Sequence, residues 1–223
     1  MAASQVKHRV AGEGEGEPIS RRASAQAAKR QQILDAARAI FIRLGFDGAS
    51  MNDVAAEAGV SKATLYVYFT NKEALFGALI EEMVAVLPEN ALKLEHSAGD
   101  LRDTLIAMGM VLMRALTKPE HVQFNRLVLA TIEKFPQFGR MFYEAGPARG
   151  MAKMQAFLQR EVAHGHLAID DIALAAHQLL DLIKSRYLVE MLLGISGRPD
   201  EAEMRGSITS GVDVFLARYG KNL

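Results

Sequence analysis

The segment SKATLYVYF, residues 61–69, gathers side chains suited to binding nucleic acid. Leu65 and Phe69 lie four residues apart, so both would point inward from one face of a helix. The side chains left outward include a cation, a hydroxyl, two tyrosines and two small apolar groups: Lys62, Ala63, Thr64, Tyr66, Val67 and Tyr68. Cations and hydroxyls bind phosphate oxygens, and small apolar groups contact thymine methyls. A helix about 12 Å long would match a major groove about 12 Å wide, so this surface predicts DNA binding.

The residues before this segment predict a short helix followed by a tight turn. Ser50 and Asp53 have the spacing of a capping box, so a helix should begin near residue 50. That helix would have a small apolar face, which consists of Val54, Ala55 and Ala58. Gly59 would supply the positive φ of a sharp turn, and Ser61 would cap the second helix. Residues 50–69 are thus predicted to form a helix-turn-helix.

Charges around the motif support this prediction. Lys72 follows Asn71, a predicted cap for the next helix, and a cation is not favoured at a helix N-terminus. A phosphate partner would account for Lys72. Residues 21–75 hold eight basic and five acidic residues, a net charge of +3, whereas the whole chain has a formal net charge of zero. The basic bias therefore lies where the helix-turn-helix is predicted.

Other interpretations of the motif stay open. A helix-turn-helix shape alone also occurs in many proteins that do not bind DNA. Tyr66 and Tyr68 could be packing residues at a domain junction, and Asn52 could simply face solvent. Arg21 and Arg22 could contact DNA or belong to a solvated tail.

Length and composition limit the classes of protein. The 223 residues, half of them hydrophobic, suffice for one small and one medium domain. The chain has no cysteine, which excludes disulfides and thiol catalysis and suits a reducing cytoplasm. No apolar run approaches the roughly 20 residues needed to span a bilayer, and the first 20 residues lack the apolar core of a secretory signal. We therefore expect a cytoplasmic protein with no membrane partner.

No set of residues predicts catalysis, a cofactor or a metal. The sequence offers no Ser-His-Asp set, paired carboxylates, H-E-x-x-H motif or nucleotide-binding loop. His164 and His166 lie two residues apart near a helix end, so they would not share a helical face, and no carboxylate was found at ligand spacing. A small helical enzyme and a carrier of hydrophobic ligands remain alternatives, although a carrier would leave the outward face of residues 62–68 unexplained.

Hydrophobic periodicity predicts an all-α fold. The first amphipathic pattern starts at Gln31 and ends at Gly45, as a left-handed C-terminal cap would require. Further helices are expected at about 50–58, 62–69, 72–95, 100–117, 120–134, 148–164, 170–194 and 201–219. We divide the chain into a disordered tail (1–20), a three-helix DNA-binding domain (21–75) and a larger helical domain for ligand binding and dimerisation (76–223).

The larger domain is rich in methionine and phenylalanine, side chains that can line a plastic pocket for a small apolar or aromatic compound. The candidate lining residues are Met108, Met113, Phe124, Phe142, Met154, Phe157 and His177. For any one of them, packing in an ordinary helical core is the alternative.

The last two helices are predicted to form a homodimer interface. Residues 172–193 are apolar around nearly the whole helix, so one face would need a partner. The last helix has an apolar stripe formed by Ile208, Gly211, Val212, Phe215, Leu216 and Tyr219. Two such helices from each subunit would give a four-helix bundle with two-fold symmetry. A thick monomer core is the alternative.

The run from Ile33 to about Phe76 closely resembles the N-terminal domain of the tetracycline-repressor (TetR) family. The matching segments are ILDAARAIFIRLGFDGAS, AEAGVSKATLYVYF and NKEALF. The resemblance implies an all-α homodimer that binds a palindromic operator in double-stranded DNA, most often as a repressor, and a body that binds an effector and changes the spacing of the two heads.

The resemblance also implies roles for single residues. Lys62, Ala63, Thr64 and Tyr66 match base or phosphate contacts of the family. Positions that match mainly contacts to the DNA backbone are Ser50, Asn52, Tyr68 and Lys72. The stretch FPQFGRMFYEAGPARGMAKMQAFLQREVAHGHLAIDDIALAAHQLLDL resembles the C-terminal domain of a subgroup related to the AefR regulator.

Overall fold

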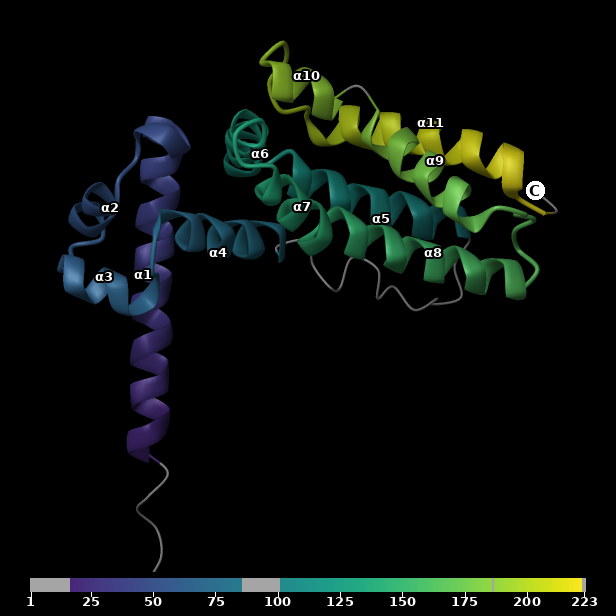
Figure 1. Ribbon diagram of the computed structural model, residues 1–223. Helices are drawn as coiled ribbons and strands as arrows, with labels where there is room; N and C mark the ends of the chain where they lie inside the picture. Colours follow the sequence, from purple (N-terminus) through teal and green to yellow (C-terminus); the bar gives the residue numbers. More distant parts are fainter. Residues whose placement is uncertain (1–16, 86–100, 186, 222–223) are drawn as a thin grey trace, which may run out of the picture.

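The computed structural model describes residues 17–85, 101–185 and 187–221, and almost all of them are helical (Figure 1). The helices are α1 (Glu17–Gly48), α2 (Met51–Glu57), α3 (Lys62–Tyr68), α4 (Lys72–Ala85), α5 (Leu101–Leu116), α6 (Pro119–Thr131), α7 (Pro136–Ala145), α8 (Pro147–Ala163), α9 (Ile172–Lys184), α10 (Tyr187–Leu193) and α11 (Glu201–Tyr219). The predicted all-α class is confirmed. We call α1–α3 the head and α4–α11 the body.

Helix α1 begins earlier than the periodicity indicates. It starts at Glu17 instead of Gln31, and in the view of Figure 1 its first part extends below α3. Its first turn, residues 17–20, overlaps the predicted tail, whose residues 1–16 lie outside the described residues. Residues 22–28 are exposed, so they need no apolar period. This segment is rich in alanine, arginine and glutamine, which favour helix intrinsically.

Gly45 does supply the predicted positive φ, but α1 does not end there. Its φ of 71° and ψ of 169° interrupt the helical path, and one further turn carries Phe46, Asp47 and Gly48. A residue with a side chain is strained at such a φ. The chain after Gly45 therefore leaves the axis of α1 and turns toward the body.

Two apolar cores hold the molecule together. The first joins the head to α4, α6 and α7, and its centre is a group of aromatic rings that we call the aromatic cluster: Phe41, Phe46, Phe76, Phe124, Phe135 and Phe138. The second core joins α5, α8, α9 and α11. The predicted domain boundary at 75/76 falls inside α4, which spans Lys72–Ala85. The first core crosses this boundary, since it continues from the head into the body.

Two predicted segments differ from the structure in the body. Residues 136–145, for which we predicted no helix, form α7, and Pro136 stands at its first position, where a missing N–H is harmless. The predicted helix 170–194 is divided into α9 and α10 after Ser185, which has a φ of 44°. The predicted helix 72–95 is described only to Ala85, and its later part lies outside the described residues.

Candidate nucleic-acid interface and ligand-binding body

Helix α3 presents the outward surface that its sequence predicts. Leu65 and Phe69 are buried, whereas the side chains of Tyr66 and Val67 are 42% and 79% exposed. The Lys62 ammonium lies 5.9 Å from the centre of the Tyr66 ring. Ser61 caps the helix, since its Oγ accepts a hydrogen bond of 3.0 Å from the backbone N–H of Thr64. The helix thus exposes a cation, an aromatic ring and a valine that no neighbouring helix covers.

Helix α2 supports α3 through the predicted capping box and turn. The Ser50 Oγ accepts a hydrogen bond from the backbone N–H of Asp53 (3.2 Å), and the Asp53 carboxylate accepts one from the backbone N–H of Ser50 (2.9 Å). The Ser50 hydroxyl also donates a hydrogen bond of 2.5 Å to the Asp53 carboxylate, and this bond, together with the one from the Ser50 backbone N–H, lowers the pKa of Asp53 because both favour its charged form. Gly59 has a φ of 60°, so the predicted turn is present. Ser50 and Asn52 are exposed beside α3.

Two candidate contact residues have protein partners. The Lys72 ammonium donates hydrogen bonds to the backbone carbonyls of Phe46 (2.7 Å) and Ala49 (3.0 Å), and it lies 4.5 Å from the centre of the Phe46 ring. It therefore neutralises the carbonyl end of α1, which explains a cation at the start of α4 without a phosphate. Tyr68 is half-buried and packs against the first core, so its ring is only partly outward.

The candidate ligand-binding residues fall into separate places. Met108, Met113, Met154 and Phe157 are buried together in the second core, between α5 and α8. Phe124 and Phe142 belong to the first core instead. His177 is exposed on α9, apart from both groups, and its place in an effector site stays a prediction. Spacing along the chain could not separate these groups, because both cores use the same residue types.

The apolar stripe of α11 that was predicted as a subunit interface faces the interior of its own chain. Ile208, Val212 and Phe215 are buried against α5 and α9 of the same chain. A Cβ on Gly211 would lie 2.8 Å from the backbone oxygen of Leu182, so this glycine permits the close approach of α11 to α9 and not of two subunits. The inward stripe is therefore intrachain core, as the alternative of a thick monomer core stated.

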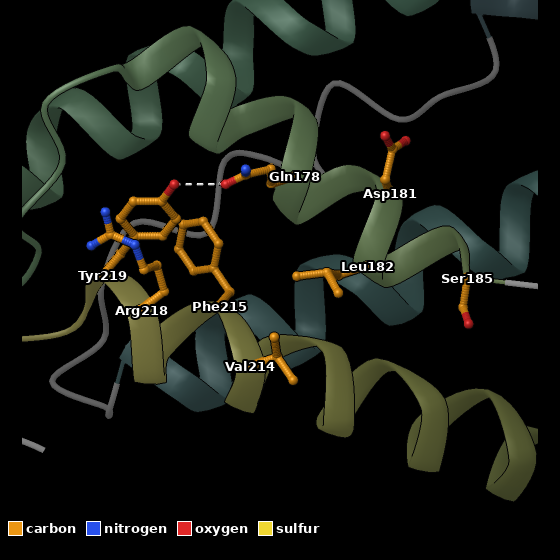
Figure 2. Close-up of a pocket in the computed structure, with 8 residues that line it drawn as sticks. All are labelled: Gln178, Asp181, Leu182, Ser185, Val214, Phe215, Arg218 and Tyr219. Carbon is orange, nitrogen blue, oxygen red and sulfur yellow. Dashed lines mark hydrogen bonds between the residues drawn. The ribbon is translucent and has the colours of Figure 1, made fainter.

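A different surface of the last helices is left uncovered. The large apolar side chains exposed there are Leu174, Val189, Leu193, Ile195 and Val214, all at least 50% exposed. Between α9 and α11 lies a shallow groove of about 550 Å³, lined by Leu182, Val214, Phe215 and Tyr219 among others (Figure 2). The Tyr219 hydroxyl donates a hydrogen bond of 2.6 Å to Gln178 across its end.

The histidines near the end of α8 also differ from expectation. The sequence predicts no carboxylate at ligand spacing for His164 and His166, but Glu161, in the last turn of α8, has its Oε2 2.9 Å from His166 Nδ1. Gly165, with a φ of 81°, turns the chain so that both rings reach this carboxylate. The missed signal is the spacing E-x-x-H-G-H across a glycine that ends a helix.

Two family models match the chain. Residues 33–79 match "Bacterial regulatory proteins, tetR family", and residues 103–221, more than half of the chain, match "AefR-like transcriptional repressor, C-terminal domain". The chain belongs to the TetR family. The resemblance stated from the sequence, to the family and to its AefR-like subgroup, is confirmed.

Solved structures and named regulators of the TetR family are similar to the chain. A TetR-family transcriptional regulator of Mesorhizobium loti is 32% identical, covers 87% of this chain and 98% of its own, and has a TM-score of 0.79. The flavonoid-responsive regulator FrrA is 31% identical over 88% of this chain and 100% of its own, with a TM-score of 0.75. The nicotine-responsive repressor HdnoR of Paenarthrobacter nicotinovorans is 30% identical over 48% of this chain and 64% of its own.

Other named regulators match over about a third of this chain: YfiR of Bacillus subtilis is 42% identical over 71 residues, and RutR of Escherichia coli is 36% identical over 74 residues. The chain covers 33% and 35% of the length of these two regulators. The predicted class of function, a transcriptional regulator with a helix-turn-helix, is confirmed by these matches and by the family models. Across the described ranges, no helix is both long and apolar enough to cross a membrane.

Proposed function

We propose that this TetR-family chain is a ligand-responsive repressor that binds a palindromic operator as a homodimer and leaves it when a small hydrophobic effector binds the body. A regulator of chromosomal genes works in the cytoplasm, so that location is part of the proposal. We propose no catalytic residues and no enzymatic activity for this chain.

The exposed surface of α3 is the observation that carries the proposal. Val67 and Tyr66 are large apolar side chains left open to solvent beside Lys62, on a helix held by α1 and α2. Exposed apolar side chains beside a cation and a hydroxyl on one short helix suit a partner that offers both methyl groups and phosphates, as DNA does. We propose that Lys62, Ala63, Thr64 and Tyr66 contact bases and phosphates, and that Ser50, Asn52 and Tyr68 contact the DNA backbone.

Fluorescence anisotropy with DNA from upstream of the chain's own gene tests this role. Tyr66→Ala should weaken specific binding about tenfold or more, which corresponds to about 1.4 kcal/mol, without changing the melting temperature. Tyr143→Ala is the matched control, because Tyr143 is 54% exposed on α7, far from α3 in the chain. Equal affinity of the wild-type protein for this DNA and for unrelated DNA, or an unchanged affinity of Tyr66→Ala, contradicts the proposal.

For the homodimer, we propose that the partner subunit covers the exposed apolar surface of α9, α10 and α11. Val214 lies in the groove of Figure 2 and is 56% exposed, so a charge at this position would be buried in the dimer. Val214→Glu should therefore yield monomers in sedimentation velocity and weaken operator binding. Leu129→Glu is the control, because Leu129 is 55% exposed on α6. A dimer that tolerates Val214→Glu but not Leu129→Glu would place the interface elsewhere.

For the effector, we propose a planar aromatic compound that enters the methionine-rich part of the second core. The support is the presence of Met108, Met113 and Met154 in the same buried core as Phe157, since methionine packs adaptably, together with the flavonoid and nicotine named for two relatives. Planar aromatic compounds should release the operator in the anisotropy assay, and aliphatic compounds of equal size should not. Release by aliphatic compounds alone would contradict this class of effector.

A further inference from the structure

Glu161, His164 and His166 form a compact group at the end of α8. Their ligand atoms, one carboxylate oxygen and two imidazole nitrogens, all lie within 4.8 Å of one another. Within the group, His166 Nδ1 is 2.9 Å and His164 Nδ1 is 3.9 Å from the Glu161 carboxylate. Nothing in the proposed DNA or effector sites uses these three side chains.

The backbone holds the three residues in place. Helix α8 ends with His164, whose N–H donates to the Arg160 carbonyl, and Gly165 reverses the chain so that the His166 N–H donates to the Glu161 carbonyl at 3.0 Å. The next residues pair with the end of α11, since Ala168 N–H donates to the Tyr219 carbonyl and Lys221 N–H to the His166 carbonyl. The arrangement is therefore fixed by main-chain bonds and not by the histidine rings alone.

Burial is unequal within the group. The Glu161 side chain is 1% exposed, whereas those of His164 and His166 are 56% and 53% exposed. A carboxylate that is taken out of water is costly unless cations or donors compensate it. The two half-exposed imidazoles are therefore the members of the group that solvent reaches.

We propose that Glu161, His164 and His166 bind one divalent transition-metal ion, with Zn²⁺ as the best-suited ion. Two imidazole nitrogens and one carboxylate oxygen are a donor set that Zn²⁺ accepts with a fourth position open, whereas Mg²⁺ and Ca²⁺ prefer oxygen ligands. Ligands about 2.1 Å from a tetrahedral ion lie about 3.4 Å apart. The exposed rings need to move by only about 1 Å to reach this geometry.

Metal binding would fix the turn after α8, which main-chain hydrogen bonds join to the carboxyl end of α11. Figure 1 shows both at the end of the body opposite the head. The ion would take the place of the proton shared by Glu161 Oε2 and His166 Nδ1, because metal ligands must be deprotonated. Affinity should therefore fall as the pH is lowered.

The test uses the full chain after treatment with a chelator. Zn²⁺ is titrated in competition with a chromophoric chelator, and Co²⁺ is added separately to record the visible absorption of a tetrahedral site. We expect one ion per chain, and at about a hundredfold excess of Zn²⁺ over its dissociation constant a rise in melting temperature of about 5–10 °C. Millimolar Mg²⁺ should not compete.

The double variant H164Q/H166Q removes both exposed imidazole ligands but keeps amide N–H donors near the buried Glu161 carboxylate, so it should fold, and its loss of metal affinity of a hundredfold or more would support the site. His177→Ala is the matched control, because this exposed histidine lies on α9 outside the group, and it should bind Zn²⁺ as the wild type does. Undiminished binding by the double variant, or a loss in His177→Ala, overturns the proposal. The result is independent of operator binding, which the assay does not involve.

Discussion

The head and the body expose apolar side chains in opposite ways. On α3 the exposed side chains form a mixed surface with Lys62, and all of them come from one segment of seven residues. On the body they come from α9, α10 and α11, and no single helix reveals them. A site within one helix can thus be recognised from spacing, whereas a site shared by several helices depends on how those helices turn toward one another.

The two regions also share a core at one point. Phe46, at the end of α1, packs against Phe135 and Phe138 near α7, and Lys134 forms an ion pair with Asp47. The head is therefore joined to the body by these contacts of Phe46 and Asp47 as well as by α4. The following predictions test how far the two regions differ in stability and function.

The largest effect is expected for Phe46→Ala. Phe46 is 3% exposed among the rings of the aromatic cluster, and truncating a buried Phe costs about 3–5 kcal/mol. One cooperative thermal transition should move to lower temperature, because the cluster belongs to both regions. The control Leu44→Ala, at a position 44% exposed, should have little effect. Two transitions in calorimetry, with only one of them displaced, would show that head and body unfold separately.

Gly211→Ala should destabilise the body by about 1–3 kcal/mol. The added methyl would lie 2.8 Å from the Leu182 oxygen and 3.0 Å from its carbonyl carbon, and backbone atoms cannot rotate away. Gly206→Ala is the control on the same helix, where nothing lies within 4 Å, and it should stabilise by up to about 1 kcal/mol. Chemical denaturation measures both. A neutral Gly211→Ala would mean that α11 does not pack this closely on α9.

Lys72→Met should lower stability by about 1–2 kcal/mol, because the carbonyl end of α1 loses its cation. The salt dependence of DNA binding should stay unchanged, since the ammonium is engaged within the head. Lys62→Met should leave the free energy of unfolding unchanged. It should reduce the slope of log affinity for DNA against log salt concentration by about one. A smaller slope for Lys72→Met would restore its predicted role as a phosphate contact.

The smallest effect concerns pH. Burial lowers the pKa of His121 below its ordinary value of 6.5. Above pH 6.5 both folded and unfolded chains hold this imidazole neutral, and as the pH falls the unfolded chain binds the proton first. Its contribution to stability is therefore lost between pH 6.5 and the lower folded pKa. His121→Leu should flatten the fall in melting temperature from pH 7.5 to 5.5, and His177→Leu should leave it as it is. If the melting temperatures of the wild type and of His121→Leu fall equally with pH, burial of His121 does not affect the pH dependence of stability.

The head was predicted from its sequence more completely than the body. Caps, turns and inward residues of α2 and α3 depend on neighbours within four residues, so Ser50, Gly59 and Leu65 were all assigned correctly. Lys72 was placed on the right helix, but its partners are carbonyls more than 20 residues earlier. In the body, Gly211 was placed on the subunit-interface stripe of α11, yet its close neighbour is Leu182 of the same chain. Long-range partners cannot be chosen from periodicity alone.

The conformation of Gly45 should make position 45 a site of regulatory mutations. Its positive φ divides α1 into a part fixed to α2 and α3 and a last turn, with Phe46 and Asp47, fixed to the body. A bulkier residue at position 45 would change the direction of the head while it leaves every proposed DNA contact and every effector contact intact. In a screen for regulators that no longer respond to their inducer, or that no longer repress, substitutions at this position would therefore appear among those in the binding sites, although the residue touches neither ligand.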